Sequence, residues 1–568
     1  MPYLNTELKK KNTFEAIVIG SGMAGGWAAK EFCEKGLKTL VLERGNEIQH
    51  VTGYTTALKN PWDFDHHGRL PLSIHTENPI ISKCYAYSEA TEHLFVKDAE
   101  HAYIQEKPFD WIRGYHTGGK SMMWARQVQR WSDFDFEGPA RDGFAVDWPI
   151  RYKDLAPWYS YVEKFVGVSG NKDGVLNLPD GEFQPAMEFN AVEKHLQSRI
   201  SENYTDRQMI VARAAHLTQP TQEQLDLGRG KCQNRSLCER GCPFGGYFTS
   251  ISATLPAAAR TKKLTMRSNA VVQSIIFDEK KNKAVGVRVI DALTKEVTEY
   301  FAKVIFVNAA CINTISILLN STSNRFQNGL GNDNGLLGKY FAFHNYRGSI
   351  HAQIDGFDDK YYAGRRPTGL YVPRFRNVTS QNMDFLRGYA ISGSAERGGW
   401  GGGEGFGADF KAAASEPGGW RIYMQHMGET IPKEQSRISL DPSLKDAWGM
   451  PTIRISVDHD DNDEKMLKDF FVQVPEMLEK AGFKNIRTRD SKQAPGLDIH
   501  EMGGCRMGKD PKTSMLNEWN QLHSCKNVFV TDGAAMTSVS TQNPSLTFMA
   551  LTARAADFAV SELKKRNL

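Results

Sequence analysis

Three cysteines stand close together near the middle of the chain, and their spacing is the clearest chemical signal in the sequence. Cys232, Cys238 and Cys242 form a C-x5-C-x3-C-P run, although the 568 residues contain only eight cysteines. Soft thiolates at short spacing are typical ligands of an iron–sulfur cluster or of zinc. Three ligands without a local fourth favour a [3Fe–4S] cluster. Zinc would need a fourth ligand, for which His216 is the candidate, and structural or disulfide-bonded cysteines are the third interpretation.

His500 is the candidate for acid–base chemistry among the 15 histidines. An imidazole has an unperturbed pKa of about 6.5, so it can take a proton from a hydroxyl group near neutral pH. A glycine pair at 503–504 predicts a turn that presents the ring to a pocket, although a structural histidine is the commoner case for this residue type. Asn543 precedes Pro544 at the start of an Ala/Leu-rich helix, where its amide can orient the same hydroxyl or simply cap the helix.

The elements that would hold a nucleotide lie near the N-terminus. Gly20 suits a tight turn, Gly22 lets the backbone approach a pyrophosphate, and Gly25 lets a helix pack on a strand. Glu43 is placed to bind a ribose 2′-hydroxyl, which favours FAD or NAD over NADP. The predicted elements are a strand at 15–19, a helix at 27–35 and a strand at 37–42. The predicted contacts of this unit are Gly20, Ser21, Gly22, Met23, Ala24, Gly25, Glu43 and Arg44.

Two later segments favour FAD over NAD. A second glycine-containing loop occupies 113–121 and carries His116, Gly118 and Gly119. A predicted strand at 527–531 ends in Asp532-Gly533, and the helix after Asn543 and Pro544 would direct its N-terminus at a reduced flavin, whose negative charge it would favour.

Composition excludes several classes of protein. The net charge of +4 is too small to argue for nucleic acid or an anionic membrane as partner. Hydrophobic residues at 40% and charged residues at 24% exclude a disordered chain and a polytopic membrane protein. No run of 18 apolar residues occurs, so no direct membrane insertion is expected. The lysines at 9–11 and the apolar stretch 14–29 look like a signal peptide, but four glycines in that stretch favour a strand–loop–helix unit.

These segments together resemble the glucose–methanol–choline (GMC) oxidoreductase family. The motifs that carry the resemblance follow the family's order: the nucleotide unit and the segments 148–158, 271–287, 304–310, 500–508 and 543–544. The resemblance implies an α/β (α+β) fold in which a discontinuous Rossmann-like FAD-binding domain is covered by a sheet-based substrate-binding domain. The FAD-binding pieces would be 1–50, 110–135, 225–345 and 495–568, and the substrate side 51–109, 136–224 and 346–494.

The resemblance also assigns roles to single residues. His500 would remove the hydroxyl proton while a hydride passes to flavin N5, and Asn543 would hydrogen-bond the same hydroxyl. His116 would contact FAD or hold it covalently, and Cys505 stands where the family usually has Thr, which we take as a tolerated small residue. The further predicted FAD contacts are Gly118, Gly119, Val272, Ala309, Asp532, Gly533, Asn543 and Pro544.

The cysteine run is similar to that of flavoprotein subunits of bacterial FAD-dependent sugar dehydrogenases, including glucoside 3-dehydrogenases, which carry a [3Fe–4S] cluster. This implies a dehydrogenase that passes electrons to a cytochrome c or quinone-type acceptor. It also implies a small export or chaperone subunit and a periplasmic location, with a cytoplasmic location as the alternative because no signal peptide is apparent. We expect iron–sulfur chemistry first, an oxygen-using oxidase with structural cysteines second, and an NAD-binding or zinc-stabilised protein without flavin chemistry third.

The substrate is the least determined part. From the resemblance we expect a sugar or glycoside oxidised at a secondary hydroxyl, with C3 of a glucoside favoured over C1 of glucose or over gluconate and fructose. Gln425, on an alternating predicted strand at 420–428, would face the pocket or be an ordinary sheet residue. The glycine-rich stretch 398–405 would be a lid or a plain surface loop.

Overall fold

A parallel sheet forms the centre of the nucleotide-binding half. The computed structural model describes residues 12–360, 368–398 and 405–568. The order of the six strands is β18-β19-β9-β1-β2-β5, and every neighbouring pair is parallel except β18 and β19. All four residues of β1, β2 and β9 are buried, as expected where helices cover both faces. The strands are β1 (Ala16–Ile19), β2 (Thr39–Leu42), β5 (Leu264–Arg267), β9 (Val304–Val307), β18 (Gln521–Leu522) and β19 (Cys525–Val530).

The stretch 14–29 forms a strand, a loop and the start of a helix, as predicted. Gly20 has a φ of +93°, and a Cβ there would lie 2.3 Å from the carbonyl oxygen of Asn308, so only glycine fits the turn. A Cβ on Gly25 would lie 1.9 Å from the Gly20 oxygen, which is how this glycine lets the helix approach the strand. The helices that pack together on this side are α2 (Met23–Glu34), α5 (Tyr152–Val166), α8 (Thr254–Arg260) and α12 (Ser545–Lys564).

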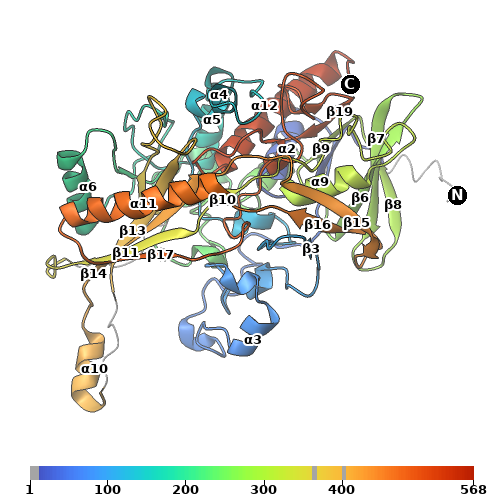
Figure 1. The fold of residues 1–568 in the computed structure, drawn as a ribbon. Coiled ribbons are helices and arrows are strands. Elements are labelled where there is room, and N and C mark those ends of the chain that lie inside the picture. The colour runs from blue at the N-terminus through green and yellow to red at the C-terminus, as the bar shows by residue number, and fades with distance from the viewer. Residues whose placement is uncertain (1–11, 361–367, 399–404) are drawn as a thin grey trace.

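A second, antiparallel sheet forms the other half. Its order is β17-β11-β14-β13-β12-β4, with β10 paired to β14. The long helix α11 (Asp461–Lys480) lies along this sheet and packs on β11, β14 and β17, while the hairpin that carries α10 (Gly407–Ser415) extends away from the body (Figure 1). The strands are β4 (Ile210–Val211), β10 (His344–Asn345), β11 (Gly348–Ile354), β12 (Leu370–Val372), β13 (Tyr389–Arg397), β14 (Trp420–Glu429) and β17 (Lys484–Asp490).

Two three-stranded sheets and several short helices complete the fold. One sheet is the meander β6 (Ala270–Asp278), β7 (Lys283–Asp291) and β8 (Val297–Phe301), and the other joins β15 (Arg437–Lys445), β16 (Pro451–Ser456) and β3 (Ile104–Gln105). The remaining α-helices are α3 (Leu72–Glu77), α4 (Asp133–Arg141), α6 (Ala191–Asn203), α7 (Gln222–Asp226) and α9 (Cys311–Asn320). The 3-10 helices are η1 (Pro61–Asp63), η2 (Ile81–Lys83), η3 (Glu92–Leu94), η4 (Gly119–Met122), η5 (Cys238–Arg240) and η6 (Gly533–Ala535).

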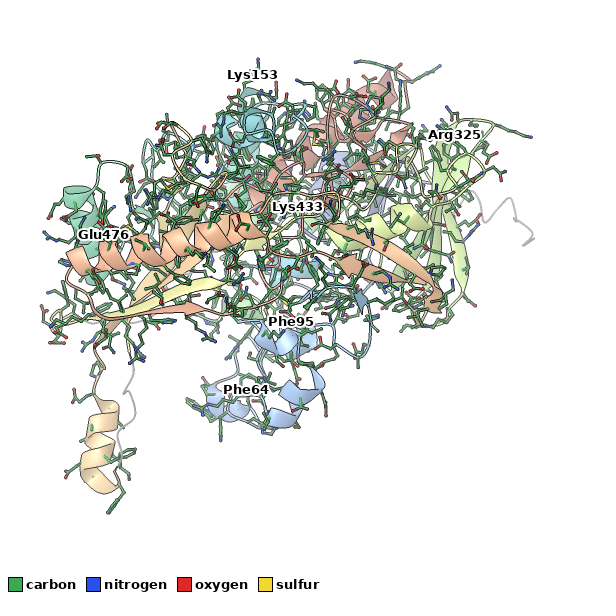
Figure 2. All side chains as sticks on the ribbon, viewed as in Figure 1. Phe64, Phe95, Lys153, Arg325, Lys433 and Glu476 are labelled. Atoms are coloured by element: carbon green, nitrogen blue, oxygen red, sulfur yellow. The ribbon has the colours of Figure 1, made fainter. Side chains whose placement is uncertain are left out.

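The two largest sheets draw their strands from different pieces of the chain. The parallel sheet draws its strands from the pieces assigned to FAD, and the seven-stranded sheet draws all but β10 from the pieces assigned to the substrate. A lobe around α3 projects from the body, with Phe64 within it and Phe95 where it meets the rest of the molecule (Figure 2). No helix in the part of the chain that the structure describes is long and apolar enough to cross a membrane.

Candidate active site

A cavity of about 340 Å³ opens where the parallel strands end. Its wall includes Ile19 and Leu42, the last residues of β1 and β2, and Asn308, which follows β9. The carboxyl edge of an open α/β sheet is where ligands bind in such folds, because the loops leaving the strands diverge there. Most residues predicted to contact a cofactor line this cavity: Gly20, Ser21, Gly22, Met23, Ala24, Glu43, Arg44, Gly119, Val272, Ala309, Asp532, Gly533, Asn543 and Pro544.

Glu43 is held at one end of the cavity by short hydrogen bonds. One carboxylate oxygen accepts from the Ser21 backbone N–H at 3.1 Å and from the Ser21 hydroxyl at 2.5 Å, and the other accepts from the Gly45 N–H at 3.0 Å. Burial raises the pKa of Glu43 above its usual range. The helix α2 starts beside it with Gly22 at the N-cap and with no side-chain cap and no acidic residue in its first turn. Its free N–H groups are therefore available to a phosphate.

Unpaired buried donors on the cavity wall fit a polar ligand. Arg44 Nε and Asn308 Nδ2 both line the cavity and have no hydrogen-bond partner among the described residues. Buried donors without partners are rare in folded proteins, so such groups indicate a missing ligand. Together with the uncapped α2 and the Glu43 carboxylate, they form a donor and acceptor set that suits a dinucleotide.

Three predicted cofactor residues are not among those that line the cavity. Gly25 has the packing role described above. Gly118 donates its N–H to the Ser21 hydroxyl at 2.9 Å and so ties the second glycine loop to the first. The His116 ring is buried behind Gly114, which does line the cavity, and its Nδ1 lies 3.1 Å from the Thr117 oxygen. Covalent attachment through His116 stays a prediction.

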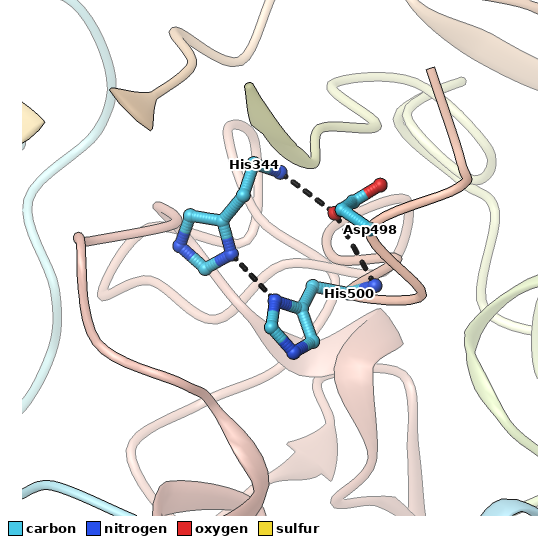
Figure 3. A group of neighbouring side chains, drawn as sticks. All are labelled: His344, Asp498 and His500. Atoms are coloured by element: carbon cyan, nitrogen blue, oxygen red, sulfur yellow. Dashed lines mark hydrogen bonds between the residues drawn. The ribbon is translucent and has the colours of Figure 1, made fainter. Parts of the chain in front are cut away.

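His500 lines the same cavity and belongs to a hydrogen-bonded group of three side chains (Figure 3). Its Nδ1 lies 2.8 Å from His344 Nδ1. One oxygen of Asp498 accepts the backbone N–H of His344 at 2.9 Å and that of His500 at 3.3 Å. Burial, with a smaller contribution from neighbouring His344 and Lys120, lowers the pKa of His500 well below its usual value. The ring is therefore a neutral base at neutral pH.

Asn543 does not cap the last helix, which corrects one of the two interpretations of this residue. Helix α12 begins at Ser545, its N-cap position is Pro544, and it has no side-chain capping bond. The Asn543 Oδ1 instead accepts a hydrogen bond from Gln127 Nε2 at 3.1 Å. Because the amide oxygen is engaged, the Nδ2 donor is the end of Asn543 that remains for a ligand in the cavity.

Several residues that complete this end of the cavity were not predicted from the sequence. His344 and Asp498 fix His500, Gln127 fixes Asn543, and Tyr346 lines the wall with its ring 6.1 Å from that of His500. A phenylalanine-rich stretch ending in His344-Asn345 was the only available signal, because β10 is two residues long and has no readable periodicity.

The three cysteines line a second, small cavity. All three are free thiols with intermediate exposure, and the Gly246 N–H donates to Cys242 Sγ at 3.4 Å. Among the side chains that the structure describes, these sulfurs are not a group whose ligand atoms all lie within 4.8 Å of one another.

His216 lines the cysteine cavity as well. It is 1% exposed, and neither ring nitrogen has a hydrogen-bond partner among the described residues. Burial lowers the pKa of His216 well below its usual value, and the guanidinium groups of Arg126 and Arg229 lower it further. The described part of the chain satisfies neither nitrogen of this neutral imidazole, which leaves both free to meet a ligand in this cavity.

One short segment separates the two cavities. Arg126 lines the large cavity and donates to Glu239, the residue after Cys238, at 3.2 Å. Tyr247, which lines the small cavity, donates its hydroxyl to the Met122 oxygen at 2.9 Å. Arg126 has a φ of +65°, a left-handed conformation that is uncommon for a residue other than glycine and that concentrates at functional sites.

Gln425 lies on β14, the predicted strand, but its side chain is used within the sheet. Its amide donates to the carbonyl oxygens of Tyr346 at 2.5 Å and Gly348 at 2.8 Å, and it is not among the residues that line the large cavity. The structure thus favours the ordinary sheet residue over the substrate contact. The stretch 398–405, predicted as a lid or a loop, falls outside the described residues for positions 399–404.

Comparisons with known proteins agree with this geometry. Two family models, both described as GMC oxidoreductase, match residues 15–345 and 432–552. The 2-methyl-1,2-propanediol dehydrogenase of Mycolicibacterium austroafricanum is 26% identical over 96% of this chain and 94% of its own length. The fructose dehydrogenase large subunit of Gluconobacter japonicus is 24% identical over 97% and 98%. A C-glycoside 3-oxidase of Arthrobacter globiformis is 27% identical over 23% of this chain and 25% of its own length.

A solved structure shows the same fold. The formate oxidase of Aspergillus oryzae, studied for modification of its FAD, superposes with a TM-score of 0.60 and 13% identity over 98% of this chain and 99% of its own. The predicted fold class, an α/β protein with a Rossmann-like FAD-binding domain, is thereby confirmed.

Proposed function

Because this chain belongs to the GMC oxidoreductase family, we propose that it is an FAD-dependent dehydrogenase that oxidises a secondary hydroxyl of a sugar or glycoside, C3 of a glucoside being favoured. Cys232, Cys238 and Cys242 would hold a [3Fe–4S] cluster, which would supply a one-electron path to an external acceptor. The observation that carries the proposal is that one segment, residues 122–127, contacts both the catalytic pair, through Asn543, and the cysteine loop, through Glu239.

The large cavity fits FAD. The adenosine end would meet Glu43, the pyrophosphate the uncapped N-terminus of α2, and the flavin end the region of Asn543 and Asp532, all of which line one cavity. Arg44 Nε and Asn308 Nδ2 would gain the partners that they lack. Bound there, FAD supplies an acceptor for the two electrons and the hydrogen that leave the carbon atom of an alcohol.

His500 and Asn543 would act on the substrate hydroxyl from two sides. Neutral His500 accepts the hydroxyl proton at Nε2, the nitrogen that points away from His344 (Figure 3). Asn543 donates from Nδ2 to the hydroxyl oxygen and stabilises the negative charge that develops on it as the proton leaves. Both groups are held by hydrogen bonds to the protein, so they need no rearrangement when a sugar arrives.

The small cavity fits an iron–sulfur cluster. Three free thiols supply the soft donor set, and the buried Arg126 and Arg229 face the sulfurs and would offset the charge of the thiolates. Such a cluster supplies a one-electron acceptor, which a dehydrogenase uses and an oxidase does not need. The half-exposed loop leaves the cluster open to an approaching acceptor, which we propose to be a cytochrome c or a quinone-type molecule.

The preference for C3 is supported by the partial match to a C-glycoside 3-oxidase, and the preference for a sugar by the full-length match to a fructose dehydrogenase subunit. Trp124 and Tyr346 give the cavity aromatic faces on which a sugar ring can stack. The competing proposals are oxidation at C1 of glucose, oxidation of gluconate or fructose, and an oxygen-using pyranose oxidase with structural cysteines. We further propose a periplasmic location, reached with a small export or chaperone subunit.

One set of spectra with iron analysis tests the proposal. Flavin bands with a broad iron–sulfur shoulder, iron in the protein, and anaerobic bleaching by methyl glucoside with a 3-keto product are expected. Flavin without iron, and peroxide as product, would favour the oxidase. Bleaching by glucose, gluconate or fructose but not by methyl glucoside would favour oxidation of that sugar over oxidation at C3 of a glucoside. A colourless protein would overturn the proposal.

A further inference from the structure

A backbone carbonyl stands at the far end of the pair of imidazoles. His344 Nε2 lies 3.0 Å from the carbonyl oxygen of Ser540. A carbonyl oxygen can only accept, so His344 Nε2 must carry the hydrogen of this bond. In a neutral imidazole only one ring nitrogen carries a hydrogen, and His344 Nδ1 is therefore a lone pair.

The protonation of His500 then follows from the 2.8 Å contact between the two Nδ1 atoms. Since His344 Nδ1 can only accept, His500 Nδ1 must donate, and His500 Nε2 is left with the lone pair that a base requires. The neutral state of His344 agrees with its surroundings, because burial lowers its pKa to about 4.

The ends of this chain of hydrogen bonds are fixed by unusual backbone. Ser540 and Ile499 each have a φ of +64°, although neither is glycine and Ile499 is β-branched. Ile499 lies between Asp498 and His500, and the Asp498 carboxylate ties the backbones of His344 and His500 together. Strained residues on both sides of a hydrogen-bonded group indicate that its geometry is maintained for a purpose other than stability.

We propose that His344 is a positioning residue. It donates a hydrogen bond to the Ser540 carbonyl and thereby holds His500 in the tautomer whose Nε2 is free to accept a proton. The inference rests on the proposed role of His500 as the base and adds what selects its reactive form. As His500 takes up the substrate proton, the bond from its Nδ1–H to His344 also strengthens, because the donor becomes charged.

The test replaces the acceptor and then restores it. His344→Leu removes the lone pair that accepts the hydrogen on His500 Nδ1. His344→Asn returns an oxygen acceptor near the same position. Anaerobic flavin reduction by methyl glucoside is followed by stopped flow. We expect the limiting rate of His344→Leu to fall by roughly 10²-fold, and that of His344→Asn to stay within about 10-fold of the wild type. The half-saturating sugar concentration and the flavin spectrum should be unchanged in both.

His426→Leu is the matched control. His426 is equally buried, lies on β14 in the same sheet as His344, and contacts the Asn345 oxygen rather than His500. The flavin of the His426→Leu variant should be reduced at nearly the wild-type rate. If His344→Leu loses flavin, His344→Phe carries the test, and loss of flavin from both would make His344 a packing residue and overturn the inference.

The remaining outcomes separate the two proposals. An unaffected rate in a flavin-loaded His344→Leu overturns the inference alone, as does an equal loss in the leucine and asparagine variants. A wild type whose flavin is not bleached by methyl glucoside, glucose, fructose or gluconate overturns the proposed function and this inference with it.

Discussion

The catalytic end of the large cavity and the cysteine pocket are built in opposite ways. In the catalytic region around His500, side chains from separate segments meet, and the hydrogen-bonding atoms that orient them are paired with one another or with backbone. In the cysteine pocket, all three sulfurs come from one short loop, and the buried His216 beside them has no partner at either nitrogen among the described residues.

Under the proposed function, this difference contrasts a site whose hydrogen bonds are completed by folding with a pocket that its cluster would complete. A base must be aimed before the substrate arrives, so its hydrogen bonds are satisfied by the protein. Burial raises the pKa of Cys238 to about 11, so the proposed cluster would have to displace the proton of this thiol. Mutations should therefore affect chemistry in the first region and cofactor loading in the second.

The largest effect is expected for the base itself. His500→Ala removes the proton acceptor but none of the residues that line the nucleotide end, so FAD should stay bound while its reduction by sugar slows by at least ~10²-fold. Stopped-flow bleaching measures the rate, and the flavin spectrum reports loading. His426→Ala, which removes a buried ring that contacts the Asn345 oxygen rather than His500, is the control. A flavin that bleaches at the wild-type rate in His500→Ala would remove His500 from the mechanism.

The second effect sharpens the contrast, because it should spare the sugar reaction. Cys238→Ser replaces one thiol of the pocket, and we expect iron content to fall to near zero and turnover with an external dye acceptor to drop by roughly 10-fold or more. The rate of anaerobic flavin reduction should be nearly unchanged, since the large cavity is intact. Cys525→Ser, at a buried cysteine outside the pocket, is the control. Wild-type iron content in Cys238→Ser would contradict the assignment.

The same contrast explains what the sequence could predict. The nucleotide unit could be predicted because each glycine has a local structural role. The strands β1 and β2 form within the predicted ranges 15–19 and 37–42, whereas α2 begins at Met23, before the predicted start at residue 27. The cysteine run was readable because its ligands lie on one loop. His344 was not, because it meets His500 across 156 positions of the chain, and such a partner leaves no local pattern.

Asn543 shows how a long-range partner overrides a local rule. Its place before Pro544 made it a reasonable cap for the last helix. Gln127, 416 positions away, engages its amide oxygen instead and turns the amide towards the cavity. The fold class and most cavity residues could thus be predicted from short motifs, whereas the residues that orient the catalytic pair could not.

A moderate effect is expected from releasing this amide. Gln127→Leu removes the donor that orients Asn543, and the freed amide can then present its oxygen to the substrate in part of the molecules. We expect the limiting rate of flavin reduction to fall by roughly 3- to 10-fold, less than for Asn543→Ala, with the flavin still bound. A double variant that loses no more than Asn543→Ala alone would show that both residues act through one hydrogen bond. If the rate losses of the two single variants multiply in the double variant, the two residues do not act through one hydrogen bond.

The smallest effect is expected from pH, and it tests whether the catalytic region is finished before the sugar binds. Burial lowers the pKa of His500 well below the usual value of about 6.5, so Nε2 keeps its lone pair throughout the neutral range and below it. Protonation removes that lone pair, so a lowered pKa shifts the acid limit of the reaction to lower pH. The other groups facing the ring are His344, Lys120 and Asp498.

Asp498 has its pKa raised to about 7 by burial, but its oxygen meets backbone N–H groups rather than either ring, so its titration should change the rate little. We therefore expect the limiting rate of flavin reduction to vary by less than about 2-fold between roughly pH 8 and pH 6.5 and to fall only below that range. Stopped-flow reduction at constant ionic strength measures it. A half-maximal rate at about pH 6.5 or above would mean that His500 titrates like an exposed histidine, and the distinction between a prearranged base and a ligand-completed pocket would be lost.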